Sequence, residues 1–292
     1  MRASVPAAAL PRGGAGPGAF LMSGKWRPAR SALFSCFITV AILNGLAPKM
    51  IVSLETKGLA ESLLSTFGVS AVVWIAAAVA IALVRDTGET STDRDLVVAA
   101  IVLPSLVVPI APAAWLGLTV LALHICASSA RNSAVWRGGW IALGVTVPVF
   151  WTPSLFKLLS QPILMADATL VSWLVGLPRD GNVVALADGS GSLWIAPECS
   201  SLANVSLAIL CWMTFMRAEG LPLTRRSLAW CALGCVLVVC VNIVRISLIA
   251  LYPDWYEVIH GPYGALVASW TILFLIAWVG LAAVRSGRAH LV

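Results

Sequence analysis

Long stretches without a single charged residue recur along this chain, and they restrict its fold more than any motif does. A helix of ~20 residues, rising ~1.5 Å per residue, crosses the ~30 Å hydrocarbon core of a bilayer. Of the 292 residues, 60% are hydrophobic and only 11% are charged, whereas soluble domains are typically ~25% charged. This pattern predicts an all-α integral membrane protein, and it excludes a soluble enzyme, a nucleic-acid-binding protein and a secreted disulfide scaffold.

The uncharged windows predict about eight transmembrane helices. The windows with room for one helix each are 31–48, 62–84, 138–156, 199–216, 227–251 and 261–284. The window 96–130 is too long for one span and has three prolines near its middle, so we expect a tight hairpin of two helices. The apolar segment 161–177 contains Asp167 and is flanked by prolines, which indicates an interfacial or re-entrant helix.

The basic residues give this topology a direction. With eight spans, 14 of the 19 Lys and Arg residues share the side of both termini, and five lie on the other side. Treating 96–130 as one span gives 10 against 9, and letting 161–177 cross gives 11 against 8. Because Lys and Arg accumulate on the cytoplasmic side of membrane proteins, both termini are expected in the cytoplasm. The same bias accounts for the net charge of +6 without a nucleic-acid partner.

Two segments differ in composition from the apolar windows. Residues 1–30 are rich in Gly, Pro and Ala, which predicts a disordered cytoplasmic tail. Residues 182–186 and 193–195 are two strand-like segments, and an Asp188-Gly189 turn signal lies between them. This order predicts a small β-hairpin. In the eight-span topology this hairpin lies outside the cytoplasm, directly before Cys199.

Cys199 differs from the other six cysteines in its surroundings. Those six lie in apolar runs, where Cys behaves as a small hydrophobic residue. Cys199 instead stands between Glu198 and two serines, at the boundary of a polar loop and an apolar run. The chain has no Cys-x-x-Cys motif and no Cys/His cluster, so we expect neither a metal ion nor another cofactor.

Three reactive or charged residues meet on the outer face in this topology: Cys199, Arg245 and His260. A membrane-embedded arginine costs roughly 2.5–3.5 kcal/mol at the centre of the bilayer and is usually functional or paired. Asn242 lies three residues before Arg245, on the same helical face, so the two are expected to line one polar pocket.

These residue types suit a thiol nucleophile. A thiolate is the attacking species, so His260 could deprotonate Cys199 and later protonate a leaving amine. Arg245 could hold a developing oxyanion or a substrate carboxylate. Further donors are expected on the first turns of the Cys199 helix, from Ser200, Ser201 and Asn204.

Each of these residues also has a structural interpretation. An interfacial cysteine can be inert, an arginine near a helix end can extend to the lipid headgroups, and a loop histidine can be ordinary surface. His124, inside the expected helical hairpin, is interpreted as a buried partner of a neighbouring helix. The alternatives therefore remain open on spacing alone.

The same residues resemble the exosortase/archaeosortase family. The resemblance covers roughly residues 150–284 and is carried by Gly176-Leu177-Pro178, Gly181-Asn182-Val183-Val184, Ala196-Pro197-Glu198-Cys199-Ser200-Ser201-Leu202, Asn242-Ile243-Val244-Arg245-Ile246 and His260-Gly261. In one departure, the usual Cys-Ser-Gly is here Cys199-Ser200-Ser201, and serine is bulkier than glycine where the backbone would be approached closely.

The resemblance implies a membrane cysteine transpeptidase with Cys199, Arg245 and His260 as its catalytic residues. The uncharged windows supply N-terminal transmembrane helices over 31–130, where nothing diagnostic of the family is found. The resemblance implies an exosortase-like catalytic membrane core over 131–292, in the bacterial cytoplasmic membrane with the site facing outward. The expected partner is an exported protein with a C-terminal sorting signal, namely a short Pro-Glu-Pro type motif, a transmembrane helix and a basic tail. Membrane lipid and an acceptor that could be a glycan or a lipid complete the expected partners.

Two other functions are weighed against this one. In lipid-linked polysaccharide assembly or export, Arg245 and His260 would hold a phosphate. A transporter or a non-enzymatic assembly factor is the second alternative. A transporter should carry polar groups within several spans and show internal symmetry, and neither is apparent in the sequence.

Overall fold

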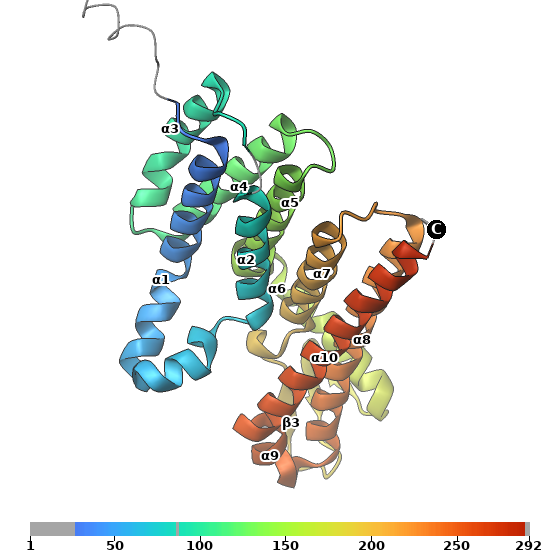
Figure 1. Cartoon of the computed structure of the whole chain (residues 1–292). Helices are drawn as coiled ribbons and strands as arrows, with labels where there is room; N and C mark the ends of the chain where they lie inside the picture. Colours follow the sequence, from blue (N-terminus) through green and yellow to red (C-terminus); the bar gives the residue numbers. More distant parts are fainter. Residues whose placement is uncertain (1–26, 86–87, 290–292) are drawn as a thin grey trace, which may run out of the picture.

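The computed structural model describes residues 27–85 and 88–289 as a helical protein with one small sheet (Figure 1). The predicted tail over 1–30 therefore lies outside the described residues up to position 26. Its last residue, Arg30, is already helical.

Ten α-helices fill the described part of the chain. They are α1 (Arg30–Leu64), α2 (Ala71–Arg85), α3 (Asp93–Val107), α4 (Ala111–Ser128), α5 (Ala134–Thr146), α6 (Thr152–Val175), α7 (Ser201–Ala218), α8 (Arg225–Leu251), α9 (Tyr256–His260) and α10 (Pro262–Arg288). Six helical stretches among these residues are long and apolar enough to cross a membrane: α1, α4, the continuous stretch through α5 and α6, α7, α8 and α10. The predicted all-α membrane character is confirmed; α2 and α3 have only 15 residues each.

The first two helices differ from the predicted windows 31–48 and 62–84. Helix α1 continues past Pro48 to Leu64, and it bends at Gly58, where φ is 74°. Glycine has no Cβ and adopts this left-handed conformation without steric cost. A short 3₁₀ turn, η1 (Thr66–Gly68), then leads to α2, so the second helix begins nine residues later than the window predicted.

The predicted boundary between 138–156 and 161–177 is a bend within one continuous helical stretch. A π-helical turn, η2 (Val147–Trp151), joins α5 to α6. Inside α6, Leu159 leaves the helical region with φ −120° and ψ 24°, three residues before Pro162. Proline lacks a backbone N–H and its ring clashes with the carbonyl four residues earlier, which explains why the helix breaks here without ending.

The long window 96–130 is divided into α3 and α4 at residues 108–110. Helix α1 holds this break, because the Asn44 side-chain amide donates to the carbonyls of Leu106 (2.8 Å) and Val108 (2.6 Å). Carbonyls in the last turn of a helix have no partner within the helix, so Asn44 satisfies the C-terminal end of α3.

A buried ionic cluster joins the beginnings of α1 and α3 to α4. Arg30 donates to Asp95 through Nε (3.1 Å) and to the Ser128 hydroxyl at 2.6 Å. His124 Nε2 lies 2.7 Å from Asp95 Oδ1, so His124 does pair with a neighbouring helix. Asp95 also accepts from the backbone N–H of Thr92 (2.9 Å) as part of a capping box. Buried charges are tolerated when paired in this way.

Removing Asp95 should be costly, because its side chain is fully buried and Arg30 would lose its principal partner. We expect Asp95→Ala to lower the free energy of unfolding in detergent micelles by about 3 kcal/mol or more. The matched control is Asp93→Ala, whose exposed side chain pairs with Arg27 and should contribute only about 0–1 kcal/mol. Equal losses in the two variants would contradict the assignment.

Several arginines join neighbouring helix ends at one side of the molecule. Arg137, at the start of α5, donates to the carbonyls of Arg217 (3.1 Å) and Ala218 (2.8 Å) at the end of α7. The Arg217 guanidinium lies over the Trp136 ring at 4.5 Å, a cation–π contact. Arg288 of α10 pairs with Glu219 after α7.

The opposite end of the C-terminal helices carries the sheet and α9 (Figure 1). The sheet has three antiparallel strands, β1 (Arg179–Asp180), β2 (Val183–Ala185) and β3 (Ser192–Trp194), in the order β1-β2-β3. The sequence predicted only the hairpin of β2 and β3, and the edge strand β1 is additional. The connection from β2 to β3 is closed by Asp188, which accepts from the Ser190 backbone N–H (2.9 Å) and hydroxyl (2.7 Å). These hydrogen bonds hold the pKa of the Asp188 carboxyl below its usual range.

Two hydrophobic clusters hold the helices together, and the smaller one contacts Cys199. The larger one fills the space between the N-terminal helices and α7, with Phe34, Leu118, Ile141 and Leu210 fully buried or nearly so. We call the smaller one the sheet cluster: it joins the second half of α6 to β2 and α8, through Leu164, Ala168, Val171, Val184, Ile195, Ile243 and Ile246. Cys199 packs against the sheet cluster.

Candidate active site

Cys199 lies in the short turn between β3 and α7. It ends the 3₁₀ turn η3 (Pro197–Cys199), and Ser200 follows as the N-cap of α7. The entry to this turn is held by Asn182, whose side-chain amide donates to the Ile195 carbonyl (3.0 Å). The Cys199 backbone N–H donates to the Ala196 carbonyl at 2.9 Å. The half-buried Cys199 thiol is therefore attached to a turn that is hydrogen-bonded on both sides.

The Ser200 and Ser201 hydroxyls both accept hydrogen bonds at the beginning of α7. The Ser200 hydroxyl accepts from the Leu202 backbone N–H (3.3 Å), as expected of an N-cap residue. The Ser200 backbone N–H is already bonded to the Pro197 carbonyl at 3.2 Å. Both serines are buried, each about 5% exposed. Neither serine is among the residues that line the Cys199 cavity, and both lie beside Cys199 in the chain.

Asn242 contacts the same turn from α8. Its side-chain amide donates to the Cys199 carbonyl (2.7 Å) and to the Ser201 hydroxyl (3.0 Å). One buried amide thus joins two residues of the turn to the long helix α8. These contacts assign Asn242 to the cysteine turn and not to a pocket shared with Arg245.

His260 is the last residue of α9 and is exposed. Its ring stacks on the ring of Tyr256, with centroids 4.8 Å apart and an angle of 13° between the planes. The two residues are four apart, so one helical turn brings them together. This stacking restricts the orientation of the imidazole.

Cys199 and His260 line one cavity of about 320 Å³. Its other walls come from β3 and the residues just after it, from α8 and from Tyr256. The structure therefore brings together a thiol and an imidazole that are 61 positions apart in the sequence. Nucleophilic catalysis by cysteine needs a base within reach of the thiol, and the shared cavity makes His260 the candidate base.

Arg245 lies outside that cavity. Its Nε donates to the Ile259 carbonyl (3.2 Å) and one terminal nitrogen donates to the His260 carbonyl (3.1 Å). It lines a different groove of about 340 Å³, between α8 and α10. The guanidinium thus holds the end of α9, and the expected polar pocket shared by Arg245 and Asn242 is not formed.

Asn204 also lies apart from Cys199. It lines a cavity of about 470 Å³ together with Ser65, Thr66 and Ser70 near η1, and with Ser269 of α10. Asn204 is not among the residues that line the Cys199 cavity.

Two contributors to the site were not predicted. Tyr256 could have been identified from its spacing to His260, since four residues make one helical turn. Asp167 accepts a hydrogen bond from the Ser201 backbone N–H (3.0 Å). The signal for Asp167 was a carboxyl group in an otherwise apolar segment, which requires a partner.

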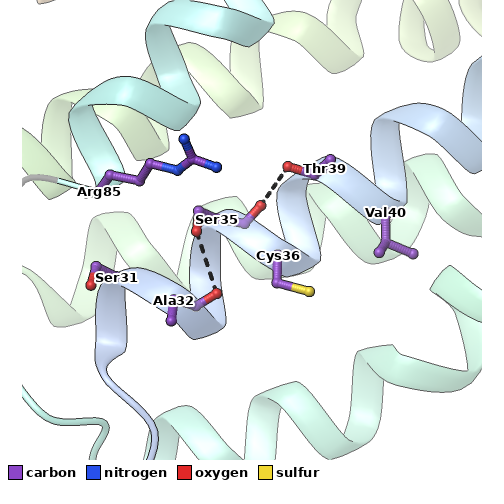
Figure 2. Close-up of a pocket in the computed structure, with 7 residues that line it drawn as sticks. All are labelled: Ser31, Ala32, Ser35, Cys36, Thr39, Val40 and Arg85. Carbon is purple, nitrogen blue, oxygen red and sulfur yellow. Dashed lines mark hydrogen bonds between the residues drawn. The ribbon is translucent and has the colours of Figure 1, made fainter.

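A second groove, of about 570 Å³, lies between α1 and the end of α2 (Figure 2). Figure 2 shows Arg85 extending from α2 over α1, where Ser35 and Thr39 donate to carbonyls of their own helix. Cys36 is its only thiol, and no histidine lines it. This groove therefore lacks the pair of groups that the Cys199 cavity contains. Nor do the described residues gather three His, Cys, Asp or Glu side chains as metal ligands would.

Comparisons with protein-family models, with curated proteins and with solved structures found no match to this chain. The functional interpretation therefore rests on the residues and the geometry of the chain itself.

Proposed function

We propose that this protein is a membrane-embedded cysteine protease-transpeptidase of the exosortase type. It removes the C-terminal sorting signal of an exported protein and transfers that protein to an acceptor. The observation that carries the proposal is the single cavity lined by both Cys199 and His260. The motif resemblance around these two residues supports the choice of substrate.

The chemistry needs only groups that are present in this cavity. His260 takes the proton from the Cys199 thiol, and the sulfur attacks the scissile carbonyl of the sorting signal. When the peptide bond breaks, His260 returns the proton to the leaving amine, and the exported protein remains as a thioester on Cys199. A hydroxyl or amine of the acceptor then attacks the thioester and gives its proton to His260. Cys199 leaves as a thiolate and takes that proton back from His260.

The proposed location is the bacterial cytoplasmic membrane, with eight spans, both termini in the cytoplasm and the site outside. The short helices α2 and α3 supply the two spans beyond the six long stretches. Contacts at the basic end of the bundle support this arrangement, because they tie the beginning of α1 to the beginning of α3 and to the end of α4. A second set joins the beginning of α5 to the end of α7.

Single cysteines in a cysteine-free protein would test this topology. Cysteines at the exposed positions Asp188 and Asp254 should react nearly completely with a membrane-impermeant maleimide in intact cells. A cysteine at the exposed position Arg131 should react only after the cells are opened. Labelling of position 131 with protection of position 188 would reverse the orientation and exclude an outward-facing site.

The reaction itself can be tested in the source organism with a candidate substrate. Such a substrate is an exported protein that ends in a short motif, an apolar helix and an Arg-rich tail, with an epitope tag added at its C-terminus. The tag should be lost when the gene for this chain is intact and retained when it is deleted. Equal processing in both strains would exclude the proposed activity toward that substrate.

A further inference from the structure

A buried carboxyl group lies against the cysteine turn and has no part in the reaction proposed above. Asp167 of α6 is only 5% exposed. Its Oδ2 accepts a hydrogen bond of 3.0 Å from the backbone N–H of Ser201, 34 positions further along the chain. The neighbouring positions of α6, among them Ala168, belong to the sheet cluster against which Cys199 packs.

This hydrogen bond is unusual for the beginning of a helix. The first N–H groups of a helix have no partner within the helix, and the N-cap residue normally satisfies one of them. Ser200 does so for Leu202. The N–H of Ser201, two residues after Cys199, is satisfied instead by a side chain from another helix. A carboxyl group is expensive to bury in an apolar segment, so a specific role for Asp167 is expected.

We propose that Asp167 is a positioning residue for the nucleophile, because its carboxyl group holds the Ser201 backbone N–H and thereby the turn that presents Cys199 to the cavity shared with His260. The inference rests on the proposed function, since it assumes that Cys199 reacts with the help of His260. Asn242 holds the same turn from α8, by the Cys199 carbonyl and the Ser201 hydroxyl. The turn is thus fixed from two helices, α6 and α8, at three atoms.

Reactivity of Cys199 toward iodoacetamide measures this positioning without a known substrate. The full-length protein in detergent micelles is alkylated at pH 7, and mass spectrometry of the Cys199 peptide gives the rate. The ratio of the wild-type rate to that of His260→Ala is the acceleration due to His260. A correctly placed base should give about tenfold or more.

Asp167→Ala should remove most of that acceleration, so that adding His260→Ala changes its rate less than twofold. Asp167→Asn keeps an acceptor oxygen in the same place and should retain at least half of the acceleration. The matched control is Thr169→Ala on the same helix, since the half-buried Thr169 donates its hydroxyl to the Met165 carbonyl within α6. Its rate should equal that of the wild type.

The backbone donor can be removed as well. Ser201 is the first residue of α7, a position where proline fits a helix, and Ser201→Pro removes its backbone N–H together with the hydroxyl that accepts from Asn242. Ser201→Pro should therefore reproduce the loss seen in Asp167→Ala, and the double variant should be no worse than either single one. Ser201→Ala keeps the N–H and loses only the hydroxyl, so it should retain more of the acceleration than Ser201→Pro.

The inference is overturned if folded Asp167→Ala keeps the full acceleration, or if Asp167→Asn is damaged as much as Asp167→Ala. If Asp167→Ala does not fold, the comparison of Ser201→Pro with Ser201→Ala decides, and equal rates overturn the inference. A wild-type protein without any acceleration by His260 contradicts the proposed function, and the role of Asp167 falls with it. The two failures are distinguishable, because only the second is visible in the wild-type protein.

Discussion

Cys199→Ala should abolish processing of the sorting signal, with a loss of at least about 1000-fold, and leave the amount of protein in the membrane unchanged. The loss is large because the proposed reaction passes through a covalent bond to the Cys199 sulfur, and removing a nucleophile disables the catalytic unit. Stability should hardly change, because Cys199 is only half-buried at the edge of the sheet cluster. The measurement is the fraction of tagged substrate that keeps its C-terminal tag, with the variant quantified in the same membranes.

The other cysteines provide the controls. Cys36 and Cys240 are exposed, so Cys36→Ala and Cys240→Ala should process the substrate like the wild type. Cys199→Ser replaces the thiol by a hydroxyl, which is a far weaker nucleophile near neutral pH, and should remain almost inactive. Full processing by Cys199→Ala would eliminate the thiol mechanism.

The general architecture of this chain could be predicted from its sequence because the bilayer imposes a simple length rule. Windows without charge identified α7, α8 and α10 closely, since a charge inside a span is costly. The rule failed where a helix extends beyond the apolar window. Helix α1 continues through Lys49, Glu55 and Lys57 to Leu64, because charges outside the hydrocarbon region do not end a helix.

The proline-based boundaries were predicted with mixed success for a similar reason. Pro109 lies between α3 and α4, where the chain turns. Pro162 lies within α6, where the helix only bends at Leu159. A proline removes one backbone donor and introduces a local clash, and packing against neighbouring helices decides whether the helix ends or bends.

At the candidate site, two of the predicted residues line one cavity, whereas Arg245 and Asn204 line two others. Cys199 and His260 do share a cavity. This could be expected because the predicted topology places both of their segments at the outer end of the helices. The directions of Arg245 and Asn242 could not be obtained from spacing, since residues three apart on a helix are ~60° apart around its axis. Here that angle lets Asn242 contact the cysteine turn while Arg245 contacts α9.

His260→Ala and Arg245→Ala should both lose about 100-fold in processing near pH 7, and both should recover part of it as the pH rises. A general base typically contributes 10²–10⁴-fold. Without it, a thiol can still ionise in alkaline solution, toward the free-thiol pKa of ~8.5. The rate of His260→Ala should therefore rise at least about tenfold between pH 7 and pH 9, relative to the wild type.

The same recovery is expected of Arg245→Ala because Arg245 acts on His260 and not on the substrate in this geometry. Its guanidinium binds the carbonyls of Ile259 and His260, so its loss releases the end of α9 and misplaces the imidazole. The double variant should then be no worse than His260→Ala, since both changes disable one function. Arg245→Lys should stay severely impaired, because an ammonium group lacks the planar fork that reaches two carbonyls.

An oxyanion role for Arg245 predicts the opposite pH dependence. A guanidinium that stabilises charge on the substrate is needed at every pH, because arginine stays protonated throughout the accessible range. Arg245→Ala would then remain inactive up to pH 9 while His260→Ala recovers, and the double variant would lose the product of the two single effects. Full activity of Arg245→Lys would reduce Arg245 to a point charge. Activity like the wild type in both Arg245→Ala and His260→Ala would leave an arginine that merely extends to the headgroups and a histidine of the ordinary surface.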